Sequence, residues 1–264
     1  MQLCDFEVGS DKPFFLIAGP CVVESEQMAM DVAAYLQELT TELGIDFIYK
    51  SSYDKANRSS HDSYRGPGID EGLKILAEVK ETLNVPILTD VHDGSPLDEI
   101  SAVVDVLQTP AFLCRQTDLL VAAAKTNLPV NVKKAQFVNG IDMEKVTEKV
   151  RLSGNNNVIL TERGNIFGYG DYVVDMRNLL IMKNFAPVVF DATHSVQKGC
   201  SGGSQGSTKH YIEPLAKAAA AVGIDGLFLE VHDDPNNALS DGTSSIKLSD
   251  LESMLYNICT VINK

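Results

Sequence analysis

The chain has 264 residues, with a hydrophobic fraction of 44% and a charged fraction of 22%, which are ordinary values for a globular protein. Its net charge of −14 argues against a nucleic-acid partner, because phosphate backbones are bound by clustered Lys and Arg. No signal peptide is visible at the start, and no run reaches the about 20 apolar residues of a membrane span. We therefore expect a cytoplasmic protein with no membrane contact. Five irregularly spaced cysteines favour free thiols over disulfides.

Eight short apolar runs follow one another along the chain, and a polar, chemically capable residue stands at the end of each. They are rich in Val, Ile and Leu without polar alternation, which is typical of parallel strands buried on both faces. In chain order the runs and their final residues are FFLIAGP with Cys21, DFIYK with Lys50, PILTDVH with Asp90 and His92, VVDVLQTP with Gln108, PVNVKK with Lys133 and Lys134, VILTER with Arg163, PVVFDATH with His194, and GLFLEVH with Glu230.

Apolar residues recur at three- and four-residue steps after each run, which predicts a helix after every strand. The expected helices span residues 25–43, 69–83, 95–104, 117–126, 143–154, 175–184, 211–223 and 248–263, and the third is among the shortest. Strand followed by helix, eight times, predicts parallel strands with right-handed crossovers.

This alternation predicts an α/β fold, the (β/α)8 TIM barrel. A barrel of this type needs ~250 residues, so we expect residues 1–264 to form one domain, with residues 1–12 as a short N-terminal extension under the barrel. A doubly wound open sheet is the alternative. Eight units and the absence of GxGxxG after the first strand favour the barrel.

The carboxyl ends of barrel strands meet at one face, so the polar residues should converge on one pocket. Cys21, His194, Glu230 and Asp241 follow strands one, seven and eight, which are neighbours in a closed barrel. A thiolate, an imidazole and two carboxylates suit a divalent metal such as Fe2+, Zn2+ or Mn2+. Spacing alone equally allows a buried thiol, a hydrogen-bonded histidine and solvated carboxylates.

Several basic residues at the strand ends indicate an anionic substrate, since phosphate and carboxylate groups are bound by Lys and Arg. The polar connection 51–68 is interpreted as a phosphate-binding loop, and the Gly/Ser-rich connection 195–209 as a loop that closes over substrate. Asp90 and His92 are candidate acid–base residues, although His92 can equally be structural. The basic residues concerned are Lys50, Lys55, Arg58, Lys133 and Arg163.

Nine motifs in order resemble the 3-deoxy-D-manno-octulosonate 8-phosphate synthase family. They are AGPCVVES, KSSYDKANRSS, SYRGPG, LTDVH, QTPAFLCRQTDLL, NVKKAQF, LTERGNIFGYG, DATHSVQ and ALSDG. The resemblance implies a (β/α)8 barrel that assembles as a homotetramer. It also implies condensation of phosphoenolpyruvate with D-arabinose 5-phosphate and water, which serves lipopolysaccharide synthesis.

The family divides into metal-dependent and metal-independent members. Metal-independent members have Asn at the position of Cys21, and usually Cys-Asp-Gly where this chain has Ser240, Asp241 and Gly242. The resemblance therefore places the chain in the metal-dependent class. It implies that the metal ligands are Cys21, His194, Glu230 and Asp241.

The resemblance also implies the substrate-binding residues. Those for phosphoenolpyruvate are Lys50, Lys55, Gln108, Lys133 and Arg163. Those for arabinose 5-phosphate are Asn57, Arg58, Ser59, Asp90 and Arg115, the last reaching in from a neighbouring subunit. The catalytic set is Lys55, Asp90 and His194. Lys134 is left out, because adjacent strand residues point to opposite sides.

The chain departs from the family pattern at Lys209 and His210, where Arg and Glu are expected, so ordering of that loop can differ. Three other functions stay open. A related synthase uses erythrose 4-phosphate, and the extra Asn57 in this chain favours the five-carbon sugar. A Schiff-base aldolase would use Lys133 or Lys134, and a non-catalytic binding barrel would use none of these residues chemically.

Overall fold

The computed structural model of the chain describes residues 1–58, 60–167, 171–198 and 209–262. Eight parallel strands form a ring, which confirms the (β/α)8 barrel and excludes the open sheet. The strands are β3 (Phe15–Gly19), β4 (Asp46–Lys50), β5 (Ile87–Asp90), β6 (Val106–Thr109), β7 (Val130–Lys133), β8 (Val158–Glu162), β11 (Val188–Asp191) and β12 (Gly226–His232). Neighbours pair in this order, and β12 closes the ring by pairing with both β11 and β3.

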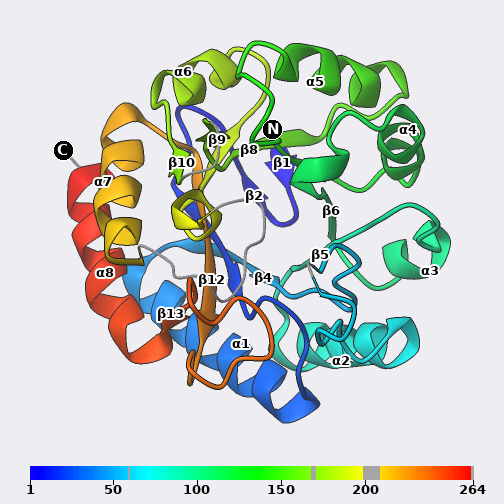
Figure 1. The fold of residues 1–264 in the computed structure, drawn as a ribbon, viewed down its shortest axis with the longest axis vertical. Coiled ribbons are helices and arrows are strands. Elements are labelled where there is room, and N and C mark those ends of the chain that lie inside the picture. The colour runs from blue at the N-terminus through cyan, green and yellow to red at the C-terminus, as the bar shows by residue number, and fades with distance from the viewer. Residues whose placement is uncertain (59, 168–170, 199–208, 263–264) are drawn as a thin grey trace.

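Helices surround the ring of strands on the outside, as Figure 1 shows. They are α1 (Glu26–Leu43), α2 (Ile69–Leu83), α3 (Leu97–Ser101), α4 (Thr117–Lys125), α5 (Met143–Leu152), α6 (Arg177–Lys183), α7 (Ile212–Val222) and α8 (Leu248–Ile262). Helix α1 begins where Ser25 accepts the Met28 amide at 3.2 Å, and it ends at Gly44 with a left-handed φ of 65°. Both are standard helix-end signals.

Two apolar layers hold the barrel together. Alternate strand residues point outward to the helices, as Leu16 and Ala18 of β3 do. The residues between them, such as Phe15 and Ile17, fill the barrel interior. This alternation decides which polar side chains at the strand ends face the interior.

Short elements complete the fold. Strands β1 (Gln2–Leu3) and β2 (Phe6–Glu7) form an N-terminal hairpin, whose Leu3 is completely buried with Phe15 and the rest of the barrel interior. Strands β9 (Asn165–Ile166) and β10 (Tyr172–Val173) pair above β8. Strand β13 (Ile246–Lys247) pairs with β12, and three short 3-10 helices are η1 (Ala111–Leu113), η2 (His194–Val196) and η3 (Lys209–Tyr211).

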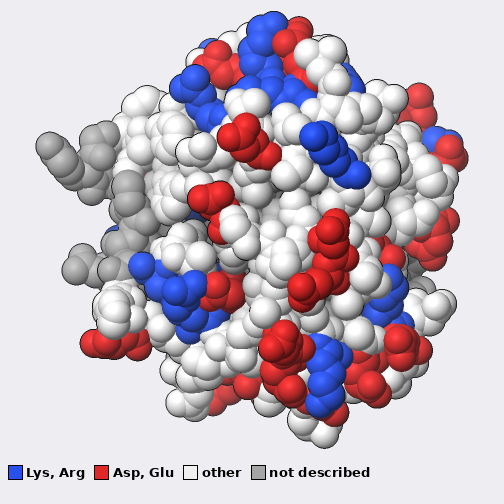
Figure 2. Space-filling model, turned by 90° about the vertical axis from the view of Figure 1, so that its right-hand side faces the viewer, with Lys and Arg blue, Asp and Glu red and all other residues white. Residues whose placement is uncertain are grey.

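The surface carries charges of both signs. On the face shown in Figure 2, acidic and basic side chains are interspersed with uncharged areas. Within the described ranges no helix has both the length and the apolar character to cross a bilayer.

Candidate active site

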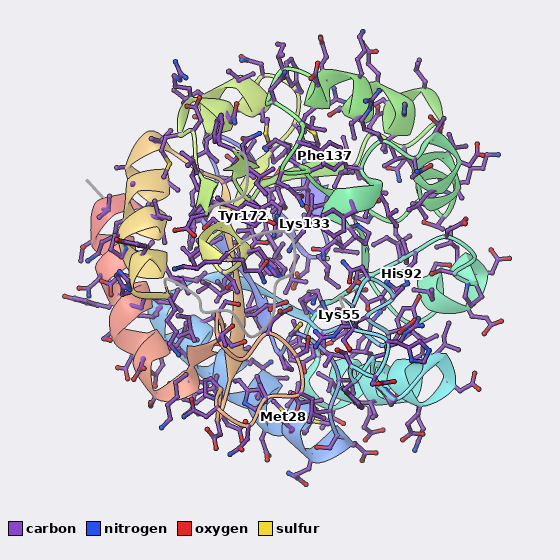
Figure 3. All side chains as sticks on the ribbon, viewed as in Figure 1. Met28, Lys55, His92, Lys133, Phe137 and Tyr172 are labelled. Carbon is purple, nitrogen blue, oxygen red and sulfur yellow. The ribbon has the colours of Figure 1, made fainter. Side chains whose placement is uncertain are left out.

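One pocket opens at the carboxyl ends of the strands, and most of the predicted site residues line it. Figure 3 places Lys55, Lys133 and Tyr172 inside the ring of helices. The lining residues are Lys50, Lys55, Asn57, Arg58, Asp90, Gln108, Pro110, Ala111, Phe112, Lys133, Arg163, Tyr172, His194, Gln197, Glu230 and Asp241. Residues up to 191 positions apart in sequence, from Lys50 to Asp241, thus meet in one cavity, because every strand delivers its last residues to the same face.

Not every predicted residue is among those that line this pocket. Cys21 lies just behind the lining, with its Sγ 3.1 Å from Asp241 Oδ2. Arg115 is exposed beside Lys149, outside the pocket of its own chain. Ser59 lies outside the described residues.

A thiol and two carboxylates gather on one side of the pocket. Ligand atoms of Cys21, Glu230 and Asp241 all lie within 4.8 Å of one another. His194 approaches the same place, with its Nε2 3.5 Å from Glu230 Oε1. Both Glu230 oxygens are buried without a hydrogen-bond partner among the described residues. Buried polar atoms are normally satisfied, so this donor set fits a divalent cation.

The charges of this cluster explain its pKa values. Burial raises the pKa of Cys21 well above its usual value, and the nearby carboxylates of Asp241 and Glu230 raise it further. Burial would also raise the pKa of Glu230, but His194 and the pocket lysines outweigh it and bring the value to about 2. Glu230 therefore carries a negative charge in the folded protein.

His194 is oriented by Asp191, a residue that the sequence analysis did not single out. Asp191 Oδ2 lies 2.8 Å from His194 Nδ1, and Oδ1 accepts the His194 backbone amide at 2.9 Å. The carboxylate also accepts a hydrogen bond from Lys133 Nζ at 2.6 Å. A carboxylate on one imidazole nitrogen leaves the other free for a metal, the arrangement common around metal-bound histidines.

Two lysines from the β4 region face the carboxylates. Lys50 Nζ lies 3.7 Å from Glu230, and Lys55 Nζ lies 3.9 Å from the same carboxylate. Burial lowers the pKa of Lys50. Burial alone would also lower the pKa of Lys55, but attraction to Cys21 and Asp90, together with other acidic groups, raises it well above its usual value. Lys55 is therefore firmly protonated.

Asp90 is held as a carboxylate. Ser52 donates a short hydrogen bond to Asp90 Oδ1, and His92 Nε2 lies 3.2 Å from Oδ2. Burial would raise its pKa, but Lys55, His92 and Lys50 bring it well below the usual range. Asp90 thus offers an acceptor rather than a proton. His92 lies behind it and is not among the lining residues.

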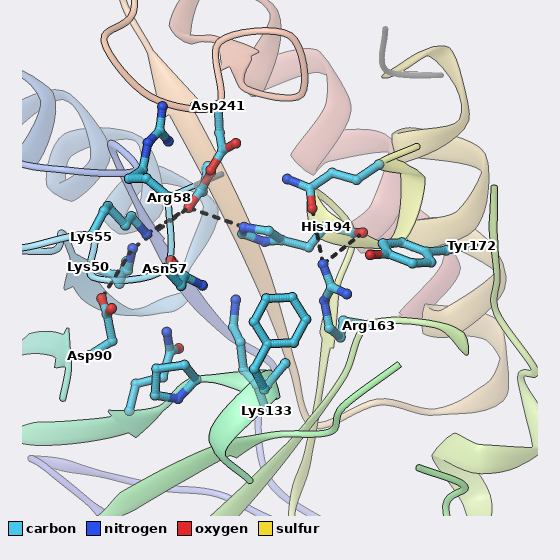
Figure 4. A pocket seen from close by; sticks show the side chains of 16 residues that line it. Lys50, Lys55, Asn57, Arg58, Asp90, Lys133, Arg163, Tyr172, His194 and Asp241 are labelled. Atoms are coloured by element: carbon cyan, nitrogen blue, oxygen red, sulfur yellow. Dashed lines mark hydrogen bonds and ion pairs between the residues drawn. The ribbon is translucent and has the colours of Figure 1, made fainter. Parts of the chain in front are cut away.

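Lys133 and Arg163 face the pocket from the other side (Figure 4). Lys133 Nζ lies 3.7 Å above the ring of Phe228 and is bonded to Asp191. Arg163 Nη2 donates to Gln197 Oε1 at 3.1 Å, while its Nη1 is buried without a hydrogen-bond partner among the described residues. A guanidinium with a free donor beside an ammonium suits a phosphate or carboxylate.

Lys134 does not reach the pocket. Its Nζ is fully buried and donates to the carbonyl oxygens of Ala135, Val138 and Gly164 at 3.0–3.2 Å. Glu162 Oε1 lies 3.4 Å away. The opposite orientation of neighbouring strand residues places Lys134 outside the barrel interior, so a Schiff base at this position has no access to substrate.

Other histidines and some loop residues lie outside the set that lines the pocket. His61 is fully exposed, with no pocket contact. Lys209 and His210 form η3, and the remainder of the connection 195–209, residues 199–208, lies outside the described residues. Tyr172 and Gln197 line the pocket without having been predicted. Gln197 stands three residues after His194 in DATHSVQ, which is the only signal the sequence offers for it.

The closed barrel and its cation-rich pocket define a TIM-barrel protein built to bind anionic groups. Residues 2–261 match the family described as "DAHP synthetase I family", and the chain belongs to this family. It is 56% identical to a 2-dehydro-3-deoxyphosphooctonate aldolase of Dichelobacter nodosus over 98% of this chain and 94% of that protein. Proteins of the same name from Methylococcus capsulatus and Legionella pneumophila are each 55% identical over 98% of this chain, covering 93% and 95% of those proteins.

Proposed function

We propose that this chain is an enzyme that condenses phosphoenolpyruvate with D-arabinose 5-phosphate and water. The products are 3-deoxy-D-manno-octulosonate 8-phosphate and inorganic phosphate, and the reaction serves lipopolysaccharide synthesis. One observation carries the proposal: cationic side chains stand on both sides of a single pocket, as two phosphorylated substrates require. The name shared by the relatives favours the eight-carbon product over the seven-carbon product of the erythrose 4-phosphate reaction.

Each substrate is assigned one side of the pocket. Phosphoenolpyruvate is placed against Lys133 and Arg163, because both cations line the pocket and Arg163 Nη1 has no hydrogen-bond partner among the described residues. Its other contacts are Lys50, Lys55 and Gln108. Arabinose 5-phosphate lies against Asn57, Arg58 and Asp90, with Ser59 of the same loop and Arg115 of a neighbouring subunit.

The chain's own residues supply position and charge. C3 of phosphoenolpyruvate attacks the aldehyde carbon, and the electron pair of the carbonyl moves to oxygen. Protonated Lys55 donates a hydrogen bond to that oxygen, and the Asp90 carboxylate accepts one from a sugar hydroxyl. Water then adds at C2 and passes one proton to the alkoxide oxygen. Its second proton leaves with the phosphate when the C–O bond to phosphate breaks, which gives the C2 ketone and inorganic phosphate. Lys133 and Arg163 stabilise the leaving phosphate. Fixing two substrates in reacting geometry can lower a barrier by ~7–11 kcal/mol.

The proposal includes a divalent metal ion, Fe2+, Zn2+ or Mn2+, held by Cys21, His194, Glu230 and Asp241. The mixed donor set supports it, as do the two buried Glu230 oxygens, which accept no hydrogen bond from the described residues. When bound, such an ion polarises a carbonyl oxygen or lowers the pKa of a bound water. Within the described residues all four cysteines are free thiols, which fits a cytoplasmic enzyme with a thiolate ligand.

The proposal also includes a homotetramer. Large apolar side chains stand exposed on the loops after the barrel strands, with Phe112, Phe137 and Phe167 exposed by 42%, 62% and 71%. Exposed aromatic groups near a pocket mouth are typical of contact surfaces. Arg115 stands three residues after Phe112 and is exposed, so its side chain is accessible to the pocket of a neighbouring subunit.

The test measures phosphate release from phosphoenolpyruvate with arabinose 5-phosphate or erythrose 4-phosphate, before and after chelation. We expect activity with the five-carbon sugar, loss on chelation, and recovery with Mn2+, Fe2+ or Zn2+. Cys21→Ala should lose the metal-dependent activity, and Cys21→Asn should keep partial metal-free turnover. Cys259→Ala, in α8, is the matched control and should behave as wild type.

The outcomes separate the parts of the proposal. Activity that survives complete metal removal would keep the reaction and reject the four ligands. Faster turnover with erythrose 4-phosphate would make the chain a seven-carbon synthase. No turnover with either sugar after preloading with each metal would reject the reaction.

A further inference from the structure

The Arg163 guanidinium lies over the aromatic ring of Tyr172. The Arg163 Cζ lies 4.7 Å from the centre of the Tyr172 ring, and both residues line the pocket. Both are buried, with residue exposures of 5% for Arg163 and 8% for Tyr172. A cation over an aromatic face is attracted to the ring, and the attraction is stronger where water is excluded.

The backbone is shaped to bring the tyrosine over the arginine. Gly164 follows Arg163 with a left-handed φ of +88°, and the chain folds back so that β10 pairs with β9, with Tyr172 opposite Ile166. A side chain on Gly164 would place its Cβ 3.3 Å from Tyr172 Cβ, which is tighter than most real contacts. Glycine permits both the turn and the close approach.

The ring completes a holder for Arg163. The guanidinium lies over the ring, while Nη2 donates to Gln197 Oε1 at 3.1 Å and lies 3.5 Å from the His194 backbone oxygen. Nη1 remains buried without a hydrogen-bond partner among the described residues. In Figure 4 the guanidinium lies between Tyr172 and the centre of the pocket, on Lys133's side and away from Arg58.

We infer that Tyr172 is a positioning residue for the anionic group of the first substrate. Its ring holds the Arg163 guanidinium at the pocket wall, so that the guanidinium is oriented for a phosphate or carboxylate oxygen. The assignment of that anion to phosphoenolpyruvate rests on the proposed function. Because Tyr172 acts through Arg163, we expect it to affect the enolpyruvate side of the pocket and to leave the sugar side unchanged.

The experiment compares Tyr172→Leu, which removes the ring, with Tyr172→Phe, which keeps it. For each variant the KM of both substrates and kcat are measured, and calorimetry gives the Kd of inorganic phosphate. For Tyr172→Leu we expect the KM of phosphoenolpyruvate and the Kd of phosphate to rise about three- to tenfold, the usual range of a cation–aromatic contact. The KM of the sugar phosphate should stay within twofold, and Tyr172→Phe should match wild type. Tyr256→Leu, on exposed α8, is the control.

A double-mutant cycle tests whether Tyr172 acts on phosphate affinity through Arg163. In an Arg163→Gln background, Tyr172→Leu should change phosphate affinity by less than twofold, because the cation it holds is gone. An undiminished loss in that background, equal losses for both substrates, or a Phe variant as weak as the Leu variant would overturn the inference. If Tyr172→Leu does not fold, Tyr172→Met makes the same comparison. An enzyme without turnover would reject the proposed function, and phosphate calorimetry would still decide the role of Tyr172.

Discussion

Replacing Lys134 by Met should destabilise the protein strongly, although the residue touches no substrate. Lys134 and Glu162 are both completely buried behind the site, with Nζ 3.4 Å from Oε1. Glu162 Oε1 also accepts the Gly164 amide at 2.5 Å, in the turn that carries Arg163. The change to Met leaves the Glu162 carboxylate buried without a counter-charge. Breaking one side of a buried ion pair costs about 3–5 kcal/mol of unfolding free energy.

The same pair predicts a pH dependence. Burial raises the pKa of Glu162 above 4.5, although Lys134 opposes the shift. A carboxyl whose folded pKa is raised contributes stability below its unfolded pKa and loses it as the pH rises through the folded value. Without Lys134 the folded pKa rises further, so the deficit of the variant should shrink between pH 7 and pH 5. Uptake of one proton changes the unfolding free energy by at most about 1.4 kcal/mol per pH unit. Between pH 7 and pH 5 the variant should therefore regain at most about 2.7 kcal/mol of unfolding free energy.

Urea unfolding followed by circular dichroism at pH 7 and pH 5 measures both effects. Adding Glu162→Gln to Lys134→Met should restore part of the stability at pH 7, because no unpaired carboxylate is then left at this position. Lys145→Met is the control: Lys145 is 72% exposed and pairs with Glu148 at the surface, where a pair contributes about 0.5 kcal/mol. A loss below 1 kcal/mol for Lys134→Met, or a deficit that grows on acidification, would refute the reasoning.

Two further variants address regions outside the pocket. Leu3→Ala should lower the unfolding free energy by about 2–5 kcal/mol, because Leu3 is fully buried with Phe15 in the barrel interior. Urea unfolding should show this while both KM values stay unchanged, and an unchanged stability would mean that the hairpin does not close the barrel. If the proposed homotetramer buries the exposed Phe137, Phe137→Asp should shift the sedimentation of the protein to smaller species, because the interface would then bury an unpaired carboxylate. Sedimentation identical to that of the wild type at micromolar concentration would exclude this face from the proposed interface.

The regular elements were predictable from the sequence for a simple reason. Strands buried on both faces need continuous apolar runs, and helices packed on one face need apolar residues every three to four positions. All eight barrel strands and all eight expected helices are present, although α3 is five residues long where ten were predicted. The two-residue strands β9, β10 and β13 escaped prediction. Pairs this short carry no periodic signal, and the contacts of the folded chain decide them.

Some residues of the site were predictable from the sequence and others were not. Residues such as Lys50, Lys133 and Glu230 were predictable because a parallel barrel delivers its strand ends to one face, and motif resemblance then assigned their roles. Asp191 and Tyr172 were not predicted. Asp191 is the last residue of its strand and was passed over in favour of His194, while Tyr172 reaches the pocket because β10 pairs antiparallel with β9.

By itself the sequence determined the order of strands and helices, the face on which chemistry occurs, and the residue types available there. Only the tertiary structure shows the partners of the adjacent lysines: Lys133 Nζ donates to Asp191, whereas Lys134 Nζ donates to backbone carbonyls such as that of Gly164. The same holds for the ionisation of Asp90 and Lys55. Burial and charges brought together from distant parts of the chain set their pKa values, and no local pattern of residues records those distances.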